Sequence, residues 1–577
     1  MDNATGKSPA ENLSWKGQAG FVLTALALQV CYPPLEWTWA AWLVLVPLIL
    51  GLSRGSVSAK GWLATGWALG AVHYGLQFTW LQHALVLVGG VSWPAYVIFH
   101  VIVALTLGLA WGGLLGAARW LWLAHGLWPG YSLPPLAALA EYLLGVLPFN
   151  GIVWGSLSGA AGLSEAALGL LPLAGAPGLV FVLCAVNSFW AWGWSWSRAR
   201  LRSRTQGSRR SGGPAPVAGG PALGALSLLA AISAPLWAGM SGAPAGISAE
   251  TVRPAGFIAL AVPGRISMTE MAAGQGRSQV LRSYLARTLE ALSLEPPVDG
   301  APLETPVLAV WPESSANGIL DREGVLDELS AAAALTGTGI LLGGTTRAAP
   351  DGAPGPQPAA GEYNSAFIAG SRPEYLRRYD KKRLVPFGEY VPWGFGWIFG
   401  DKLTRGEEDF SPGATAPVLE WEGHRLGIAI CFESILPAHY REAVLAGAGA
   451  MITIANDAWL DGPAKRQHLL LTATRAQEVG REVLFVANLG PSALLRPGEG
   501  IAGNPPGGRQ PFFTMIRPDR RLTPYSRWGL WASLLFMAAL SVTASALHRL
   551  QSRLQSRLLH RLPAHGPLNG QGHDPGS

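Results

Sequence analysis

The stretch RLGIAICFESI (425–435) decides how the second half of this chain is interpreted. An apolar run ends at Cys431, and a segment with a helical pattern follows it. Such a run is typical of a buried strand, and a strand-to-helix turn exposes one side chain while directing backbone N–H groups to the same place. Cys431 is therefore a candidate nucleophile, and the N–H of Phe432 is a candidate oxyanion donor. A buried strand cysteine is the alternative interpretation.

Other strand-like and helical patterns alternate around this stretch. The strand-like runs are 256–262, 306–314, 338–346, 363–370, 450–459 and 483–490, and the helical ones are 275–293, 322–335, 436–446 and 464–480. Apolar strands separated by helices indicate strands that are buried on both faces. The simplest α/β architecture is a sheet layer covered by helices, or that layer doubled into a sandwich. The segments 347–362 and 496–508, rich in Pro and Gly, are predicted loops.

The remainder of the chain is far more apolar. Of 577 residues, 49% are hydrophobic and only 14% are charged, which excludes an ordinary soluble protein. Several runs approach the roughly 20 residues that a membrane span needs. They lie at 18–32, 37–53, 62–82, 92–117, 133–147, 174–196, 222–240 and 528–547. The sequence thus predicts about eight spans, although the shorter runs are also compatible with core helices.

Basic residues mark one side of this predicted bundle. The loops at 33–36, 83–91 and 148–173 contain no Lys or Arg, whereas the alternate segments carry Lys7, Lys16, Arg54, Lys60, Arg119 and the arginines between 198 and 210. Cytoplasmic loops are the ones enriched in Lys and Arg, so the N-terminus is predicted to be cytoplasmic. The predicted units are a bundle of about seven helices (1–240), an extracytoplasmic domain (241–527), a last span (528–548) and a disordered basic tail (549–577).

The net charge of +6 arises largely from these flanking residues, so we interpret it as a sign of topology and predict no nucleic-acid partner. Of the three cysteines, Cys31 and Cys184 fall in or beside spans, where small apolar packing explains them. Cys431 is the one cysteine of the exported domain, so it cannot form a disulfide inside it. No Cys or His pair has metal-ligand spacing, and no metal is predicted.

Two further groups complete a possible acyl-transfer site. Glu313 ends the run VLAVWPE, where a desolvated carboxylate can act as a base; a turn carboxylate is the alternative. Lys381 lies in YDKKRLVPFGEY beside two other basic residues, and the residues alone do not choose among them. Glu389 and Glu433 are carboxylates that could orient this lysine or the substrate.

An aromatic, glycine-rich loop follows Glu389. Its large side chains are Trp393, Phe395, Trp397 and Phe399. On an exported domain such a loop is a candidate lid or membrane-dipping segment, and packing on its own domain is the alternative.

The motifs WPES (311–314), YDKKRLVPFGEYVP (379–392), ICFES (430–434) and TIANDAW (453–459) resemble the nitrilase, or carbon-nitrogen hydrolase, superfamily. Together with the predicted spans they resemble its membrane branch, the apolipoprotein N-acyltransferases. The resemblance implies an α-β-β-α sandwich, with Glu313 as base, Lys381 as oxyanion and proton support, Cys431 as nucleophile, and Glu389 as a further essential glutamate.

The resemblance also implies a reaction and a location. An acyl chain from a phospholipid, typically phosphatidylethanolamine, forms a thioester on the cysteine and passes to the α-amino group of a diacylglyceryl apolipoprotein, without cofactor. The expected location is the bacterial inner membrane, with the catalytic domain on the periplasmic side. Departures from the family pattern are Phe432 in place of Tyr and VANLGPS (486–492), which keeps Asn488 and Gly490.

Two alternatives share the same residues. A membrane-bound nitrilase-type amidase would use the same three catalytic side chains to hydrolyse a small amide. A catalytically inactive binding domain would need none of them. The multi-span bundle and the aromatic loop favour a lipid donor, because a tether alone would need one span.

Overall fold

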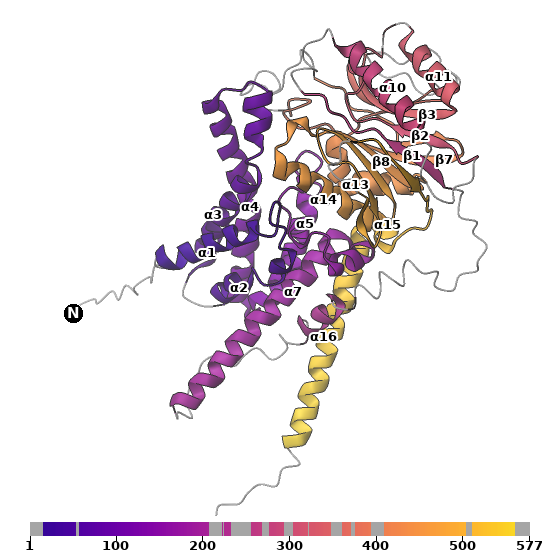
Figure 1. Ribbon diagram of the computed structural model, residues 1–577. Helices are drawn as coiled ribbons and strands as arrows, with labels where there is room; N and C mark the ends of the chain where they lie inside the picture. The colour runs from indigo at the N-terminus through magenta and orange to yellow at the C-terminus, as the bar shows by residue number, and fades with distance from the viewer. Residues whose placement is uncertain are drawn as a thin grey trace, which may run out of the picture.

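The structure is a computed structural model that describes residues 15–53, 57–206, 222–233, 256–267, 276–293, 304–347, 361–370, 376–393, 409–503 and 510–559, except positions 223, 232, 321 and 323. An N-terminal helical bundle lies against a domain with two β-sheets, and the last helix returns beside the bundle (Figure 1). The segment 241–255 and the tail 560–577 lie outside the described residues.

The bundle is built from helices of unequal length. They are α1 (Trp15–Gln29), η1 (Thr38–Trp42), α2 (Val46–Leu52), α3 (Ala59–Gln77), η2 (His83–Val88), α4 (Trp93–His125), α5 (Pro129–Leu144), α6 (Leu157–Ala161) and α7 (Glu165–Gln206). Helices α3 and α4 pack through glycines, since a Cβ added at Gly70 or Gly108 would meet the backbone of the other helix within 2.8 Å. Small residues allow such close helix approach in membranes.

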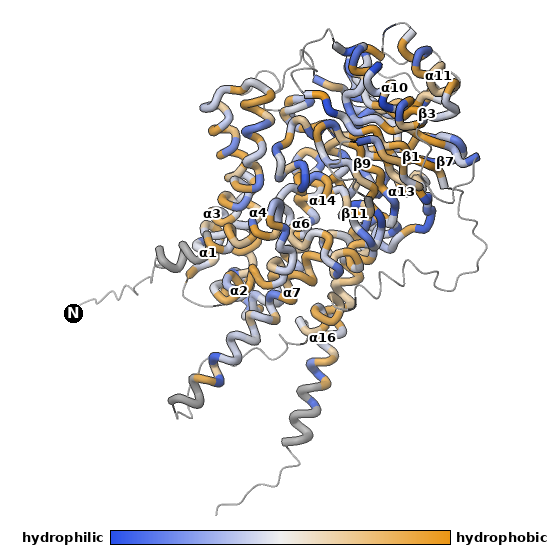
Figure 2. Tube along the Cα trace, viewed as in Figure 1, coloured by the Kyte–Doolittle hydropathy of each residue, from blue (hydrophilic) through white to orange (hydrophobic). Residues whose placement is uncertain are grey.

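Among the described residues, three helices are long and apolar enough to cross a membrane: Trp93–His125, Glu165–Leu201 and Leu530–Leu550. The segment Thr38–Leu52 forms shorter apolar helices. In Figure 2, hydrophobic residues (orange) are frequent along the bundle and the upper part of α16 (Leu530–Leu559), whereas hydrophilic residues (blue) are more frequent in the domain above. The other expected spans stay predictions, and the one at 222–240 is described only as far as residue 233.

Part of the predicted basic tail is helical. Helix α16 continues to Leu559, so the prediction of a disordered segment from 549 is wrong for residues 549–559. The physical reason is composition: LHRLQSRLQSRLL contains no Gly or Pro and is rich in Leu, Arg and Gln, which favour helix.

The second unit contains two six-stranded sheets. The first has the order β12-β1-β2-β3-β4-β5, formed by β1 (Phe257–Ala261), β2 (Val307–Val310), β3 (Thr338–Thr346), β4 (Tyr363–Ala369), β5 (Arg377–Asp380) and β12 (Phe512–Ile516). The second has the order β11-β10-β9-β8-β7-β6, formed by β6 (Val418–Trp421), β7 (His424–Ile430), β8 (Ala450–Asn456), β9 (Val483–Asn488), β10 (Ala493–Arg496) and β11 (Gly500–Gly503).

Alternating side chains of each strand fill different layers. Phe257 and Ala259 of β1 face a shared core with Ile428 and Ile430 of the second sheet, whereas Leu260 faces outward. Helices α10 (Arg277–Ser293) and α11 (Val325–Thr336) cover the outer face of the first sheet, and α13 (Pro437–Leu445) and α14 (Gly462–Val479) cover that of the second. The fold is the predicted α-β-β-α sandwich.

The strands that the sequence patterns missed are short and lie at or next to the sheet edges. They are the edge strands β5, β6, β11 and β12, and β10, which lies beside β11. Strand β11 lies inside the predicted loop 496–508, so that prediction is wrong for residues 500–503. Its sequence GIAG carries almost no strand signal, and its pairing with β10 supplies the order that the residues alone do not specify.

The sandwich and the bundle share a hydrophobic core at the end where the catalytic candidates lie. Ile435 and Leu436, just after Cys431, and Ala464 and Leu471 of α14 pack in the same cluster as the membrane helices. The backbone N–H of Ala176, beside the break in α7 at Gly175, donates to Glu478 Oε1 of α14 at 2.8 Å. The two-sheet domain thus contacts the bundle through α14 and the segment that follows Cys431.

Candidate active site

Cys431 lies where strand β7 turns into the 3-10 helix η4 (Cys431–Ile435). Its φ of +51° is in the left-handed region, which costs a non-glycine residue of order 1–3 kcal/mol and is found most often at functional sites. The thiol therefore lies at a sharp turn that the surrounding contacts must hold. The sequence prediction of a strand-to-helix turn at this residue is confirmed.

Glu313 lies just beyond the end of β2, and only 6% of its surface is exposed. Asn364 Nδ2 donates to its Oε1 at 2.8 Å, and the backbone N–H of Asn456 donates to its Oε2 at 2.9 Å. Burial raises the pKa of Glu313, while Lys381 and these two donors lower it. The carboxylate is held at a fixed position with an increased affinity for a proton, as a general base requires.

Lys381 is the lysine that reaches Glu313. Its Nζ lies 2.8 Å from Glu389 Oε1 and 3.7 Å from Glu313 Oε1, and the residue is 1% exposed. The neighbouring Lys382 and Arg383 instead form ion pairs with Glu442 of α13. The sequence alone did not decide which of the three basic residues contacts the candidate base. In the structure it is Lys381, which lies beside Glu313 and Glu389.

Glu389 and Asn364 complete the cluster. Glu389 accepts hydrogen bonds from Lys381 Nζ, from Asn364 Nδ2 at 3.0 Å and from the backbone N–H of Val385 at 2.8 Å. Asn364, at the start of β4, donates to both glutamates. Asn364 could not be found from the sequence, because an Asn between Tyr363 and Ser365 in a strand has no local signal of such a role.

The charges around Cys431 influence the pKa of its thiol. Two carboxylates face one ammonium, so an uncompensated negative charge remains. Burial, followed by the charge of Glu313, raises the pKa of Cys431 well above its ordinary value, although Lys381 acts in the opposite direction. Burial would lower the pKa of Lys381, but Glu389 and Glu313 raise it on balance. These pKa directions favour a neutral thiol beside a charged Lys381 ammonium over a preformed thiolate.

Glu433, a predicted supporting residue, binds backbone groups next to Lys381 and Cys431. It is fully buried, and its Oε1 accepts hydrogen bonds from Tyr379 Oη at 2.7 Å and from the backbone N–H groups of Lys382 at 2.9 Å and Arg383 at 3.0 Å. Its Oε2 accepts from the backbone N–H of Ile430 at 3.0 Å. Glu433 thus ties the loop after Lys381 to the strand end before Cys431, which fixes their relative position.

A buried Asp–His pair, also missed from the sequence, contacts the nucleophile's own peptide. Asp457 Oδ1 lies 2.8 Å from His468 Nδ1, and His468 Nε2 lies 2.9 Å from Ser434 Oγ and 3.3 Å from the carbonyl oxygen of Cys431. Asp457 Oδ2 has no hydrogen-bond partner among the described residues. The close approach of Gly490 explains why that position has no side chain, because a Cβ there would lie 2.2 Å from this oxygen.

The charge of Asp457 adds to the burial that raises the pKa of Cys431. We therefore expect Asp457→Asn to lower the thiol pKa, so that alkylation of Cys431 by iodoacetamide reaches half its maximal rate at a lower pH. Acyl transfer should nevertheless slow about 10-fold or more, since the peptide that carries the thiol loses its anchor. Asp461→Asn, which retains the N-cap of α14, is the control. If the pH dependence of alkylation is unchanged in Asp457→Asn, the charge of Asp457 does not raise the pKa of Cys431.

Asn364 gives a second test. Its hydrogen bond to Glu313 lowers the pKa of that carboxyl. In Asn364→Ala the pKa of Glu313 should rise further, and because the base must be ionised, the acid limb of the kcat/KM–pH profile should move to higher pH. Ser365→Ala is the matched control, since Ser365 is the next residue of β4 and its Oγ donates to Asp380 of the neighbouring strand β5. If the acid limb of the Asn364→Ala profile stays at the wild-type pH, Glu313 is not the general base.

The loop that carries Glu389 is anchored on the bundle. The ring of Phe387 lies 5.4 Å from that of Phe99 in α4 and 5.8 Å from that of Phe149. Phe432 also packs against the bundle core. Of the predicted lid, Trp393 is 99% exposed, whereas Phe395, Trp397 and Phe399 lie outside the described residues. Packing of Trp393 on its own domain is therefore wrong; its role as a lid stays a prediction.

Asn456 and Asn488 join the ends of two neighbouring strands at this edge. Asn488 Nδ2 donates to Asn456 Oδ1 at 3.0 Å and to the carbonyl of Ile266 at 2.8 Å. Asn488, which this chain keeps within VANLGPS, thus holds Asn456, whose backbone N–H donates to Glu313. In the part of the chain that the structure describes, no group of three or more His, Cys, Asp or Glu residues could hold a metal ion.

Two family models match this chain, one in the helical bundle and one in the two-sheet domain. The family model of the apolipoprotein N-acyltransferase N-terminal domain matches residues 24–189, and that of carbon-nitrogen hydrolase matches residues 282–512. The apolipoprotein N-acyltransferase of Bordetella bronchiseptica is 27% identical over 94% of this chain and 98% of its own length. The chain belongs to the apolipoprotein N-acyltransferase family.

Other relatives are similar over different extents. The apolipoprotein N-acyltransferase of Geobacter metallireducens is 35% identical, but the match spans only 33% of this chain and 37% of that protein. That of Azotobacter vinelandii is 29% identical over 93% of this chain and 96% of its own length. A solved structure of Saccharomyces cerevisiae Nit3, a member of the nitrilase superfamily, is 17% identical, with a TM-score of 0.34, and covers 47% of this chain and 93% of that one.

Proposed function

We propose that this membrane acyltransferase moves a fatty acyl chain from a phospholipid to an apolipoprotein, with the chain carried on Cys431 between the two steps. The observation that carries the proposal is the buried cluster of Glu313, Lys381 and Glu389 at the turn that holds Cys431. Family membership supports an acyltransferase that acts on lipoproteins with a lipid donor.

In the first step Glu313 accepts the proton of the Cys431 thiol while the sulfur attacks the ester carbonyl carbon of the phospholipid. A C–S bond forms, and the oxyanion is stabilised by Lys381 Nζ and the backbone N–H of Phe432. The C–O bond of the ester then breaks, and Glu313 returns the proton to the glycerol oxygen. The lysophospholipid leaves, and the acyl chain remains as a thioester.

In the second step the acceptor amine attacks the thioester carbonyl carbon. Glu313 accepts a proton from the amine nitrogen, a C–N bond forms, and the C–S bond breaks. The proton returns to the sulfur, which restores the neutral thiol. Each step uses Glu313 as base and then as acid, and Lys381 keeps its charge throughout, because Glu389 and Glu313 hold its pKa high.

The contacts between site and bundle support a lipid donor over a small amide. Phe432 and Phe387, which flank the nucleophile and Glu389, pack against the bundle. A soluble amide would reach the thiol without such contacts, whereas an acyl chain must pass from a bilayer to the site. Phosphatidylethanolamine as donor and a diacylglyceryl N-terminal cysteine as acceptor remain part of the proposal.

The proposed location is the bacterial inner membrane, with the domain on the periplasmic side, as the basic loops predict. The exposed Trp393 offers a test of sidedness. A Trp393→Cys variant should react with a membrane-impermeant maleimide in intact spheroplasts, without lysis. Labelling only after lysis would place the domain in the cytoplasm and exclude the proposal.

The reaction itself is tested with purified full-length protein in detergent. Phosphatidylethanolamine with a deuterated sn-1 chain and a diacylglyceryl peptide should yield an N-acylated peptide carrying the label, together with one equivalent of lysophospholipid. The peptide without its diacylglyceryl group is the control acceptor. Release of free fatty acid at the same rate with or without acceptor would favour a hydrolase.

A further inference from the structure

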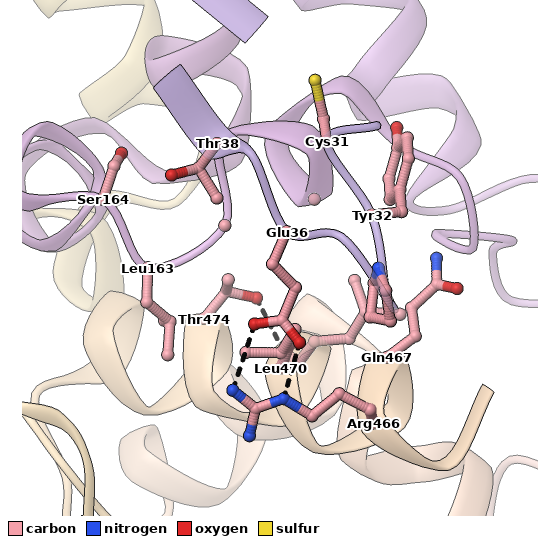
Figure 3. A pocket seen from close by; sticks show the side chains of 14 residues that line it. Cys31, Tyr32, Glu36, Thr38, Leu163, Ser164, Arg466, Gln467, Leu470 and Thr474 are labelled. Atoms are coloured by element: carbon pink, nitrogen blue, oxygen red, sulfur yellow. Dashed lines mark hydrogen bonds and ion pairs between the residues drawn. The ribbon is translucent and has the colours of Figure 1, made fainter. Parts of the chain in front are cut away.

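A cavity of about 220 Å³ lies between the bundle and helix α14 (Figure 3). It is lined by the loop after α1, by residues of α6 and the loop after it, and by one face of α14. Liquid water occupies about 30 Å³ per molecule, so the volume is far larger than one or two bound waters need. The cavity is therefore large enough for a small polar group.

The cavity does not belong to the thiol site. Gln467, Leu471 and Thr474 of α14 line it, whereas His468 and Thr472 of the same helix contact Ser434 on the side of Cys431. Helix α14 thus separates the cavity from the nucleophile. The acyl-transfer steps above make no use of this space.

An ion pair of opposite charges lies in the cavity. Arg466 Nε and Nη2 donate to the two carboxylate oxygens of Glu36 at 2.8 and 3.1 Å, as Figure 3 shows. The two side chains are 38% and 30% exposed, and a pair so open to solvent contributes only about 0–1 kcal/mol. A ligand that carries both charges can replace it at little cost.

Glu36, which forms this pair, has an unusual backbone conformation. Its φ is +52°, in the left-handed region that disfavours side chains. Such strain persists where the surrounding structure imposes it, and it clusters at ligand sites. The carboxylate is thereby fixed toward α14, although Glu36 lies on the bundle loop.

The same loop carries the features of a membrane–water interface. Leu35, Trp37 and Trp39 are 50%, 49% and 63% exposed, and the two indole rings stack with centroids 6.2 Å apart. Exposed tryptophans are enriched where lipid headgroups begin. The charged pair therefore lies beside a segment suited to headgroup depth, where a lipid can offer both charges at once.

We propose that this cavity binds the headgroup of a zwitterionic phospholipid, with its phosphate on Arg466 and its ammonium on Glu36. A guanidinium fork matches two phosphate oxygens, and a carboxylate matches an ammonium. An anionic headgroup without an ammonium would meet the repulsion of Glu36. The site is distinct from the Cys431 site, and the proposal does not depend on acyl transfer.

The test uses full-length protein with Cys431→Ser, so that no donor is consumed, titrated in detergent with dioleoyl phosphatidylethanolamine or dioleoyl phosphatidylglycerol. Bound lipids are counted by native mass spectrometry. We expect at least about 5-fold preference for the ethanolamine lipid at one site. Glu36→Gln should abolish or reverse this preference, because an unpaired Arg466 now faces the anion. Arg466→Gln should weaken binding of both lipids.

Glu420→Gln is the matched control, since Glu420 forms another exposed ion pair, with Arg425. Leu163→Trp should block binding by filling the cavity while leaving the ion pair in place. Soluble glycerophosphoethanolamine should compete with the ethanolamine lipid, and glycerophosphate should compete less well. If both lipids bind equally to wild type and Glu36→Gln, or if variants lose thermal stability without any change in lipid binding, the pair is only a structural contact and the proposal is overturned.

Discussion

Replacing Cys431 with serine is expected to lower the rate of acyl transfer by at least about 10⁴-fold, the scale seen when a nucleophile that acts as part of a catalytic unit is removed. The serine hydroxyl keeps the shape of the turn, but it is a far weaker nucleophile than sulfur beside the same base. The measurement is transfer of a labelled acyl chain to a diacylglyceryl peptide, with thermal melting to show that the fold is retained.

Cys184→Ala is the matched control, because Cys184 is fully buried in α7 among apolar side chains. It should retain transfer within about 3-fold, with a modest loss of stability from the lost packing. Transfer by Cys431→Ser at more than about one hundredth of the wild-type rate would contradict a covalent role for the sulfur, whatever the control shows.

Lys381→Met is expected to slow transfer by about 10³-fold or more. The ammonium both stabilises the oxyanion, where one donor contributes about 10²–10³-fold, and lowers the pKa of Glu313. Without it the buried Glu313 and Glu389 face each other uncompensated, so the base takes up a proton at higher pH. The acid limb of the pH profile should therefore move upward, as in Asn364→Ala but further.

Lys382→Met separates this effect from a general loss of positive charge. Lys382 pairs with Glu442 and is about one-third exposed, so its removal should change the rate by less than about 3-fold. If acyl transfer slows more in Lys382→Met than in Lys381→Met, Lys382 and not Lys381 stabilises the oxyanion. Melting temperatures of both variants distinguish a loss of chemistry from a loss of fold.

Two of the three candidate catalytic groups, Glu313 and Cys431, could be located from the sequence because each lies at the end of an apolar strand. Glu313, Cys431 and Asn456 follow or end β2, β7 and β8, whose patterns were visible in the sequence. Side chains at the ends of such strands meet at one edge of an α/β fold. The residue pattern alone did not decide among Lys381, Lys382 and Arg383, since the choice depends on Glu442 of α13, a contact across about 60 positions.

The supporting contacts were not predictable for a related reason. Asn364 reaches Glu313 across 51 positions, and His468 reaches the Cys431 carbonyl across 37, without a local pattern that marks either. Glu433 was predicted to orient a catalytic group, and the sequence did not show that it would do so through backbone N–H groups next to Lys381 and Cys431. Short edge strands such as β11 were missed because pairing, not side-chain pattern, gives them order.

The most direct measurement is the intact mass of the wild-type protein after incubation with phosphatidylethanolamine in the absence of acceptor. We predict an added mass of one acyl chain less the displaced hydrogen, located on the peptide that contains Cys431 and lost within one turnover when diacylglyceryl peptide is added. N-acylated peptide formed without any such adduct, or an adduct on another residue that is chased at the same rate, would contradict it.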